Sequence, residues 1–94
     1  MLIRSQDKER IMNFTGASVG IEQEMSNDNN ICIAIFYSEN AYEELGEYST
    51  KAKAMKVLDM IQEAYCKFMS VKNDDAWVGK ESVFYMPEDS EVEV

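Results

Sequence analysis

The stretch from Tyr48 to Val71, YSTKAKAMKVLDMIQEAYCKFMSV, constrains the fold of this chain more than any other segment. At 100° per residue, one face of a helix over this stretch collects apolar side chains. They are Ala54, Val57, Leu58, Ile61, Ala64, Tyr65 and Phe68. Ser49 or Thr50 can cap the first turn by accepting a hydrogen bond from a backbone amide. Because about 20 residues make about 30 Å of helix, we predict one amphipathic helix that crosses a small sheet.

Short apolar segments on both sides of this helix predict strands. Ile31–Ser38 is the strongest, because both of its faces are apolar, as in a central strand that a helix covers. Tyr42–Tyr48 is predicted to pair with it as a hairpin. Shorter strands are predicted at Leu2–Ser5, Arg10–Phe14, Val19–Glu24 and Ser82–Met86. The predicted fold class is α+β, an antiparallel β-sheet of about five to six strands with one long helix packed on one face, in the order βββββαβ.

The length of the chain, 94 residues, is that of one domain, which we place at residues 1–87. Residues 88–94 follow Pro87 and are mostly acidic, so we expect a mobile C-terminal tail. No apolar run approaches the roughly 18 residues that span a bilayer, and no secretory leader is evident. We therefore expect a cytoplasmic protein without a membrane partner, in which Cys32 and Cys66 are buried free thiols rather than a disulfide.

The predicted helix is basic in an acidic chain. Residues 51–72 carry five lysines against two acids, whereas the whole chain has a net charge of −9. Lys51, Lys53 and Lys56 lie in the first two turns, where cations oppose the helix dipole. A cationic helix start with free amides can bind an anion. These lysines are therefore our anion-binding candidate, for a nucleotide phosphate or an acidic segment of a partner.

The same lysines have a simpler interpretation. They can form ion pairs with carboxylates on the preceding strand, namely those of Glu43, Glu44 and Glu47. Lys51 and Lys53 also point to different sides of a helix, so they need not converge.

Apolar residues outside the main stripe are our interface candidates. Trp77 lies in a polar segment and is either an interface anchor or a lid over one end of the core. Met55, Met60 and Met69 border the stripe and can extend it into a subunit interface. We therefore expect a homodimer.

The residue types needed for common chemistries are missing. The chain has no histidine, which is the commonest general base and metal ligand and the usual partner of a Ser or Cys nucleophile. No phosphate-binding, dinucleotide-binding or nucleophile-elbow glycine motif occurs. We therefore predict no catalytic residue, no cofactor and no metal, in a chain that is not an enzyme. A net charge of −9 repels polyanions, so direct nucleic-acid binding is not expected.

Three segments carry a family resemblance: the opening MLIRSQDK, the central LGEYSTKAKAMKVLDMIQEAY and the ending VFYMPEDSEVEV. Together they resemble a family of short hypothetical proteins of Gram-positive bacteria and their phages and prophages. The resemblance implies a cytoplasmic protein associated with a mobile element. It implies no activity and no site residues.

Three hypotheses follow. The first is a small non-enzymatic binding protein, a phage or prophage accessory that acts by protein–protein contact with a host or phage protein, as an anti-CRISPR inhibitor of host defence does. The second is a nucleotide-sequestering or sensing domain that uses Lys51, Lys53 and Lys56. The third is a structural homo-oligomer.

Overall fold

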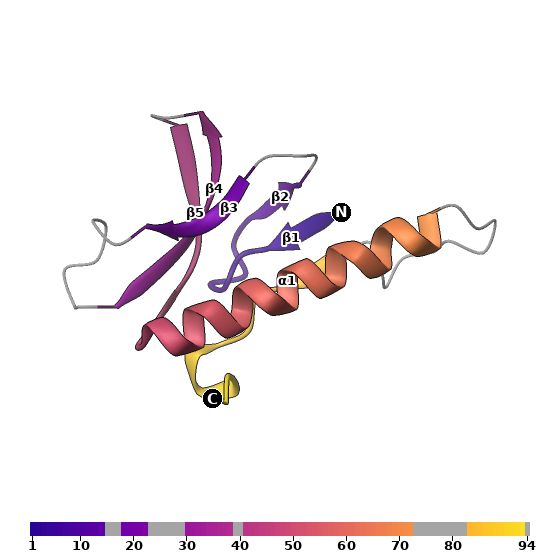
Figure 1. Ribbon diagram of the computed structural model, residues 1–94. Helices are drawn as coiled ribbons and strands as arrows, with labels where there is room; N and C mark the ends of the chain where they lie inside the picture. Colours follow the sequence, from indigo (N-terminus) through magenta and orange to yellow (C-terminus); the bar gives the residue numbers. More distant parts are fainter. Residues whose placement is uncertain (15–17, 23–29, 39–40, 73–82, 94) are drawn as a thin grey trace.

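The computed structural model describes residues 1–14, 18–22, 30–38, 41–72 and 83–93 (Figure 1). Trp77 lies outside these ranges. In chain order the elements are β1 (Leu2–Arg4), β2 (Ile11–Asn13), β3 (Ser18–Glu22), β4 (Ile31–Ser38), β5 (Ala41–Tyr48), α1 (Lys51–Lys72), β6 (Val83–Tyr85) and the 3-10 turn η2 (Asp89–Glu91). The predicted α+β class and the order βββββαβ are confirmed.

The helix forms as one unbroken element of 22 residues, α1. Its first turn is capped by Thr50, whose Oγ1 accepts a hydrogen bond from the backbone N of Lys53 at 3.1 Å. The face that α1 turns toward the sheets buries Ala54, Val57, Ile61 and Phe68. The amphipathic pattern therefore predicted both the extent of the helix and its buried side.

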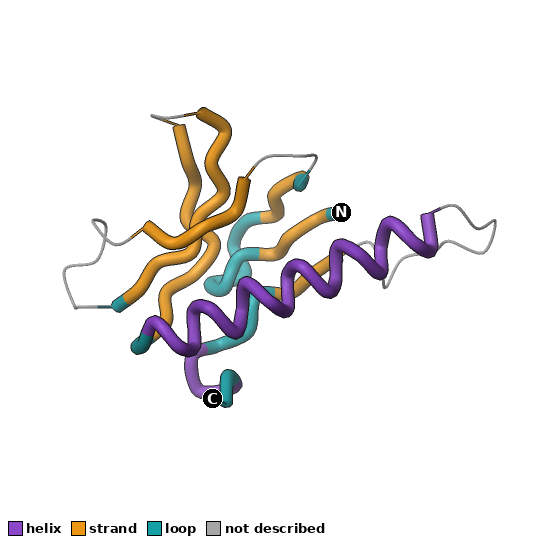
Figure 2. The backbone as a smooth tube through the Cα atoms, viewed as in Figure 1, coloured by secondary structure: helices purple, strands orange, loops and turns teal. Residues whose placement is uncertain are grey.

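The prediction of a single antiparallel sheet is wrong. The strands form two three-stranded sheets, with the orders β2-β1-β6 and β3-β4-β5, and α1 runs alongside both (Figure 2). The β3-β4-β5 sheet is antiparallel throughout, but β6 pairs with β1 in parallel. β6 follows α1 along the chain, and a long helical connection allows parallel pairing, whereas a tight hairpin does not.

One core lies between the two sheets and α1. Ile3 and Met12 enter it from the first sheet, and Ile33, Ile35 and Tyr48 enter it from the second. Cys32 and Ala34, on the opposite face of β4, are also fully buried. Residues on both faces of β4 are therefore buried, as its continuous apolar sequence predicts.

Residues 88–93 of the acidic C-terminal segment contact the rest of the chain, whereas we expected a mobile tail over residues 88–94. Tyr48 Oη donates a hydrogen bond to Pro87 O at 2.8 Å, and the side chain of Val92 is buried in the core cluster. Asp89 accepts hydrogen bonds at the start of α1. An apolar anchor and a charged contact thus hold residues 88–93 against the same body as residues 1–87.

Within the described ranges, no helix has the length and apolarity that crossing a bilayer requires.

Candidate functional site

The start of α1 does hold an anion, and that anion belongs to the same chain. Lys53 Nζ lies 3.3 Å from Asp89 Oδ2 and donates a hydrogen bond to Asp89 O at 3.0 Å. Asp89 Oδ1 also accepts hydrogen bonds from Ser49 N at 2.7 Å and from Ser49 Oγ at 3.1 Å. The bond from the Ser49 amide, followed by those from the Ser49 hydroxyl and Lys53, lowers the pKa of Asp89 below its ordinary value.

Of the three candidate lysines, Lys53 contacts Asp89 within the described part of the chain. Lys53 faces Asp89, whereas Lys51 and Lys56 are exposed and make no hydrogen bond or ion pair within the described part of the chain. The alternative partners on β5 do not meet these lysines either: Glu43 lies 4.0 Å from Arg10 instead.

The methionine candidates differ in exposure. Met55 is 47% exposed and Met69 is 39% exposed, whereas Met60 is half-buried. Both cysteines are free thiols, as predicted. Cys32 is buried, but Cys66 is exposed, so the prediction of a buried thiol is wrong for Cys66. Cys66 lies beside the apolar stripe of α1, where the buried side of the helix meets its solvent-exposed side.

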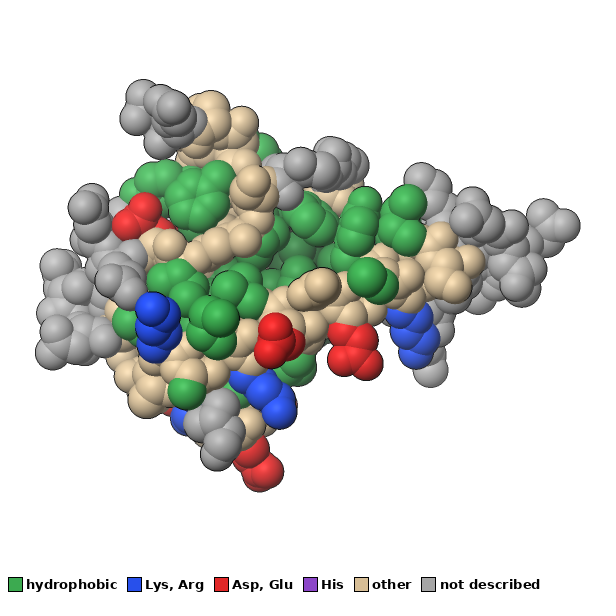
Figure 3. All heavy atoms as spheres, in the orientation of Figure 1, with side chains coloured by type: hydrophobic (Ala, Val, Ile, Leu, Met, Phe, Trp, Pro, Cys, Tyr) green, Lys and Arg blue, Asp and Glu red, His purple; other side chains and the backbone are tan. Residues whose placement is uncertain are grey.

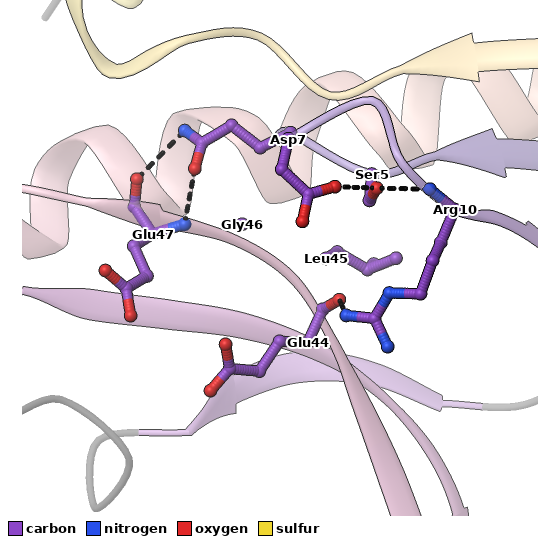
Figure 4. A pocket seen from close by; sticks show the side chains of 8 residues that line it. Ser5, Asp7, Arg10, Glu44, Leu45, Gly46 and Glu47 are labelled. Carbon is purple, nitrogen blue, oxygen red and sulfur yellow. Dashed lines mark hydrogen bonds between the residues drawn. The ribbon is translucent and has the colours of Figure 1, made fainter.

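Sequence reasoning missed a cavity between the β1–β2 turn and β5 (Figure 4). The turn is fixed by the buried Ser5, whose Oγ donates to Asp7 Oδ1 and accepts a hydrogen bond from Arg10 N at 3.1 Å. Asp7 Oδ1 also accepts from Glu9 N at 2.9 Å. Lys8 completes the turn in the left-handed region, with φ of 66°.

The cavity has a volume of about 200 Å³, and acidic residues outnumber basic ones among the residues that line it. Asp7, Glu44 and Glu47 are the acidic residues that line the cavity, and Arg10 is the basic residue that lines it. Arg10 is already engaged, because its Nη2 donates to Glu44 O at 3.3 Å. Hydrogen bonds to the Ser5 hydroxyl and the Glu9 amide lower the pKa of Asp7, so its carboxyl stays ionised near neutral pH.

A β-bulge explains why two of these carboxylates lie together. Ala34 pairs with Glu44 and Ile33 pairs with Gly46, so Leu45 is an extra residue in β5. In a regular strand, residues three apart point to opposite faces. The extra residue cancels one alternation and puts Glu44 and Glu47 on the same face.

The thiol of Cys32 is buried on this face of the sheet, close to its carboxylates. Burial first, and then the carboxylates of Glu44, Glu47 and Glu22, raise its pKa to about 12. Cys32 is register partner to Glu22 on β3 and to Glu47 on β5. We call Glu22, Glu44 and Glu47, together with the cavity that Asp7 borders, the acidic face. A thiol with a raised pKa carries little thiolate, so Cys32 is not an activated nucleophile.

The acidic face lacks the arrangement of a metal centre: no group of three acidic or cysteine side chains in the described ranges could hold an ion. The sequence contained part of the signal for this face, in the glutamates between Tyr42 and Tyr48. Regular alternation places residues 44 and 47 on opposite sides of a strand, and Gly46 is the one sign in the sequence of the bulge that pairing with β4 creates at Leu45.

No family model matches the chain, and no curated protein or solved structure shows a significant match to it.

Proposed function

We propose that this chain is a small non-enzymatic binding protein that docks through its acidic face onto a basic surface of another protein. The observation that carries the proposal is the pairing of Glu44 and Glu47 on one face by the bulge, beside the cavity that Asp7 borders. A lysine or arginine side chain of the partner fits this cavity by charge, and the net charge of −9 steers a basic partner toward it.

Binding of this kind depends on several contacts together. One exposed ion pair contributes about 0.2–1 kcal/mol, so a lone carboxylate would not hold a partner. The acidic face offers Glu22, Glu44 and Glu47 together with Asp7. The affinity is expected to fall as salt screens these charges, since the Debye length shortens from about 30 Å at 0.01 M to about 3 Å at 1 M.

The family resemblance motivates the kind of partner. A phage or prophage accessory that inhibits a host defence system, as anti-CRISPR proteins do, would compete with nucleic acid for a basic cleft. The acidic face supports this proposal because its carboxylates can occupy the positions in such a cleft that nucleic-acid phosphates otherwise occupy. The nucleotide-binding alternative has less support, because Lys53, one of its three lysines, is already paired with Asp89 of the same chain.

The test is a pull-down from a Gram-positive host lysate at low and high salt, with the tagged wild-type chain and two matched variants as baits. Glu44→Gln/Glu47→Gln removes two charges from the acidic face, and Asp59→Asn/Glu63→Gln removes two charges from the exposed side of α1. A loss of about 1.4 kcal/mol in binding free energy makes the dissociation constant of the complex ten times larger. We expect the first variant to lose the partner at a salt concentration at which the second retains it.

Two outcomes would contradict the proposal. One is the absence of any partner whose capture is sensitive to salt. The other is an equal loss of the partner in both variants, which would mean that overall charge rather than the acidic face is responsible.

A further inference from the structure

The outer face of the β3-β4-β5 sheet, opposite the core, carries aromatic side chains next to the acidic face. Register partners in an antiparallel pair lie side by side on one face. Phe36 is the register partner of Tyr42. Two residues along each strand, Ala34 is the partner of Glu44. Residues two apart on a strand point to the same side, so both aromatic side chains share the face of Glu44. Figure 3 shows hydrophobic side chains gathered over the β4–β5 hairpin, with an acidic side chain beside them.

We call Phe36 and Tyr42 the aromatic pair. Their ring centroids lie 5.7 Å apart, with the ring planes at 45°. Both side chains are half-buried, and neither belongs to the core cluster. A Cβ atom added at Gly20 would lie 3.6 Å from Phe36 Cε2, which places this ring over β3 on the outer face. The aromatic pair is therefore part of the surface of the sheet rather than of its core.

Three rows of register partners build this outer face. In order along the strands, the rows are Ser18, Phe36 and Tyr42; Gly20, Ala34 and Glu44; and Glu22, Cys32 and Glu47. The row of Glu44 otherwise contains only a glycine and an alanine, so no large side chain of the sheet separates Glu44 from the aromatic pair. Along β5, Tyr42 and Glu44 are about 7 Å apart. An aromatic surface and a carboxylate thus lie within reach of one ligand side chain.

The charge on this face has one sign. The strands β3, β4 and β5 contain no lysine or arginine. Glu44 and Glu47 form no ion pair within the described ranges, and Arg10 donates to the backbone carbonyl of Glu44 rather than to its carboxylate. After burial, the carboxylates of Glu44, Glu47 and Glu22 raise the pKa of the Cys32 thiol, so their negative charge acts on one point of the face. A cation therefore complements the surface beside the aromatic pair.

We propose that the outer face of the β3-β4-β5 sheet receives an arginine side chain of the basic partner, whose guanidinium group lies against the aromatic pair and pairs with the carboxylate of Glu44. This inference rests on the proposed docking through the acidic face. It adds the residue type that the partner presents and the side chains of this chain that select it.

Geometry favours arginine over lysine at this position. A guanidinium group is planar, so it stacks on an aromatic ring while it donates two parallel hydrogen bonds to a carboxylate. The ammonium group of lysine is compact and strongly hydrated, so it gains less from a ring that water also reaches. A cation held over an aromatic face in this way adds to the affinity even at an exposed site.

The experiment compares two probes, capped hexa-arginine and hexa-lysine peptides, which carry the same charge and differ in the cationic group. Their binding to the full chain is measured by isothermal titration calorimetry at about 0.05 M NaCl, where charges are weakly screened. Because the net charge of −9 attracts both peptides, the ratio of their dissociation constants is the quantity of interest. We expect hexa-arginine to bind about threefold more tightly or better.

Variants of the aromatic pair test the origin of this preference. Tyr42→Leu and Phe36→Leu each remove one ring, and each is expected to bring the ratio closer to one while the dissociation constant for hexa-lysine changes little. Tyr85→Leu is the matched control, since Tyr85 is exposed but belongs to the other sheet, and it is expected to leave the ratio unchanged. Thermal melts followed by circular dichroism confirm that each variant is folded.

Nuclear magnetic resonance locates the contact in the wild-type chain without any substitution. We expect hexa-arginine to shift the amide signals of Gly20, Ala34 and Glu44 more than those of α1. The side-chain protons of the bound arginine are expected to move upfield, because an aromatic ring shields protons that lie against its face.

Two double variants separate this inference from the proposed function. If Glu44→Gln/Glu47→Gln and Asp59→Asn/Glu63→Gln bind hexa-lysine equally, the acidic face is not a docking site, and the proposed function and this inference both fail. If only the first variant weakens binding, the acidic face is supported. The arginine site alone is then overturned if the wild-type chain binds both peptides equally, or if Tyr85→Leu lowers the ratio as much as Tyr42→Leu does.

Discussion

The side-chain amide of Gln6 pairs with the backbone of Glu47 as a neighbouring strand would. Gln6 Oε1 accepts a hydrogen bond from Glu47 N at 2.9 Å, and Gln6 Nε2 donates to Glu47 O at 3.0 Å. The backbone N of Gln6 adds a bond to Leu45 O at 2.8 Å, and its Nε2 also donates to Pro87 O at 3.2 Å. One residue of the β1–β2 turn therefore closes the outer edge of β5 and ties both sheets to the C-terminal segment.

This pairing requires a glycine at position 46. A Cβ atom added to Gly46 would lie 2.9 Å from Gln6 Cβ, closer than real Cβ contacts allow. The bulge, the glycine and the glutamine are therefore one arrangement, and the same arrangement sets the positions of Glu44 and Glu47 on the acidic face.

Gly46→Ala is the first prediction. Because the new methyl group meets a turn fixed by several hydrogen bonds, we expect a loss of about 1–3 kcal/mol in the free energy of unfolding, as for other overpacked sites. Urea denaturation followed by circular dichroism measures it. Gly20→Ala is the matched control, since a Cβ atom there meets Phe36 Cε2 at an ordinary 3.6 Å. Equal losses in the two variants would remove the steric explanation.

Gln6→Ala is the second prediction. It leaves the amide and carbonyl of Glu47 without their partners at a half-buried position, and an unsatisfied buried group costs about 1–3 kcal/mol. We expect a lower urea midpoint and faster exchange of the Glu47 amide hydrogen with solvent. Gln62→Ala, on the exposed face of α1, serves as control and is expected to change neither quantity. Unchanged exchange at Glu47 in Gln6→Ala would show that water replaces the side chain at no cost.

The parts of the fold that sequence predicted are those that local patterns determine. The period of apolar residues fixed α1 and its buried face, and Thr50 caps the helix where a hydroxyl residue was expected. The apolar character of both faces of β4 likewise predicted its burial.

The parts that were missed depend on contacts between distant residues. Parallel pairing of β1 with β6 joins the two ends of the chain, and no local pattern encodes it. The segment EVEV reads as a charged tail, but Val92 finds an apolar site that the rest of the chain supplies. The bulge at Leu45 is set by pairing with β4, so the acidic face became visible only in three dimensions.

The contact between Asp89 and the start of α1 leads to a prediction about pH. The pKa of Asp89 is lowered in the folded chain, chiefly by the Ser49 amide. A lowered folded-state pKa means that the contact stabilises the fold above the unfolded value of about 3.9, and that this stabilisation is lost as pH falls through the folded value. We expect Asp89→Asn to unfold at a lower urea concentration than the wild-type chain at pH 7, and the difference to shrink below about pH 4.

Asp7→Asn separates this effect from general acid sensitivity. The pKa of Asp7 is also lowered, by hydrogen bonds from the Ser5 hydroxyl and the Glu9 amide. The difference in urea midpoint between the wild-type chain and Asp7→Asn should therefore shrink over the same pH range. Only Asp89→Asn, however, should also increase hydrogen exchange in the first turn of α1. A difference between wild type and Asp89→Asn that stayed constant from pH 7 to pH 3 would show that ionisation of Asp89 is not involved.

The two cysteines should differ in reactivity. Cys32 is fully buried with a pKa raised to about 12, whereas Cys66 is exposed on α1. Thiolate is the reactive form, so a disulfide reagent at pH 8 is expected to modify one thiol per folded chain rapidly and the second only after urea unfolds the protein. Cys66→Ser should abolish the rapid phase, and Cys32→Ser should leave it intact.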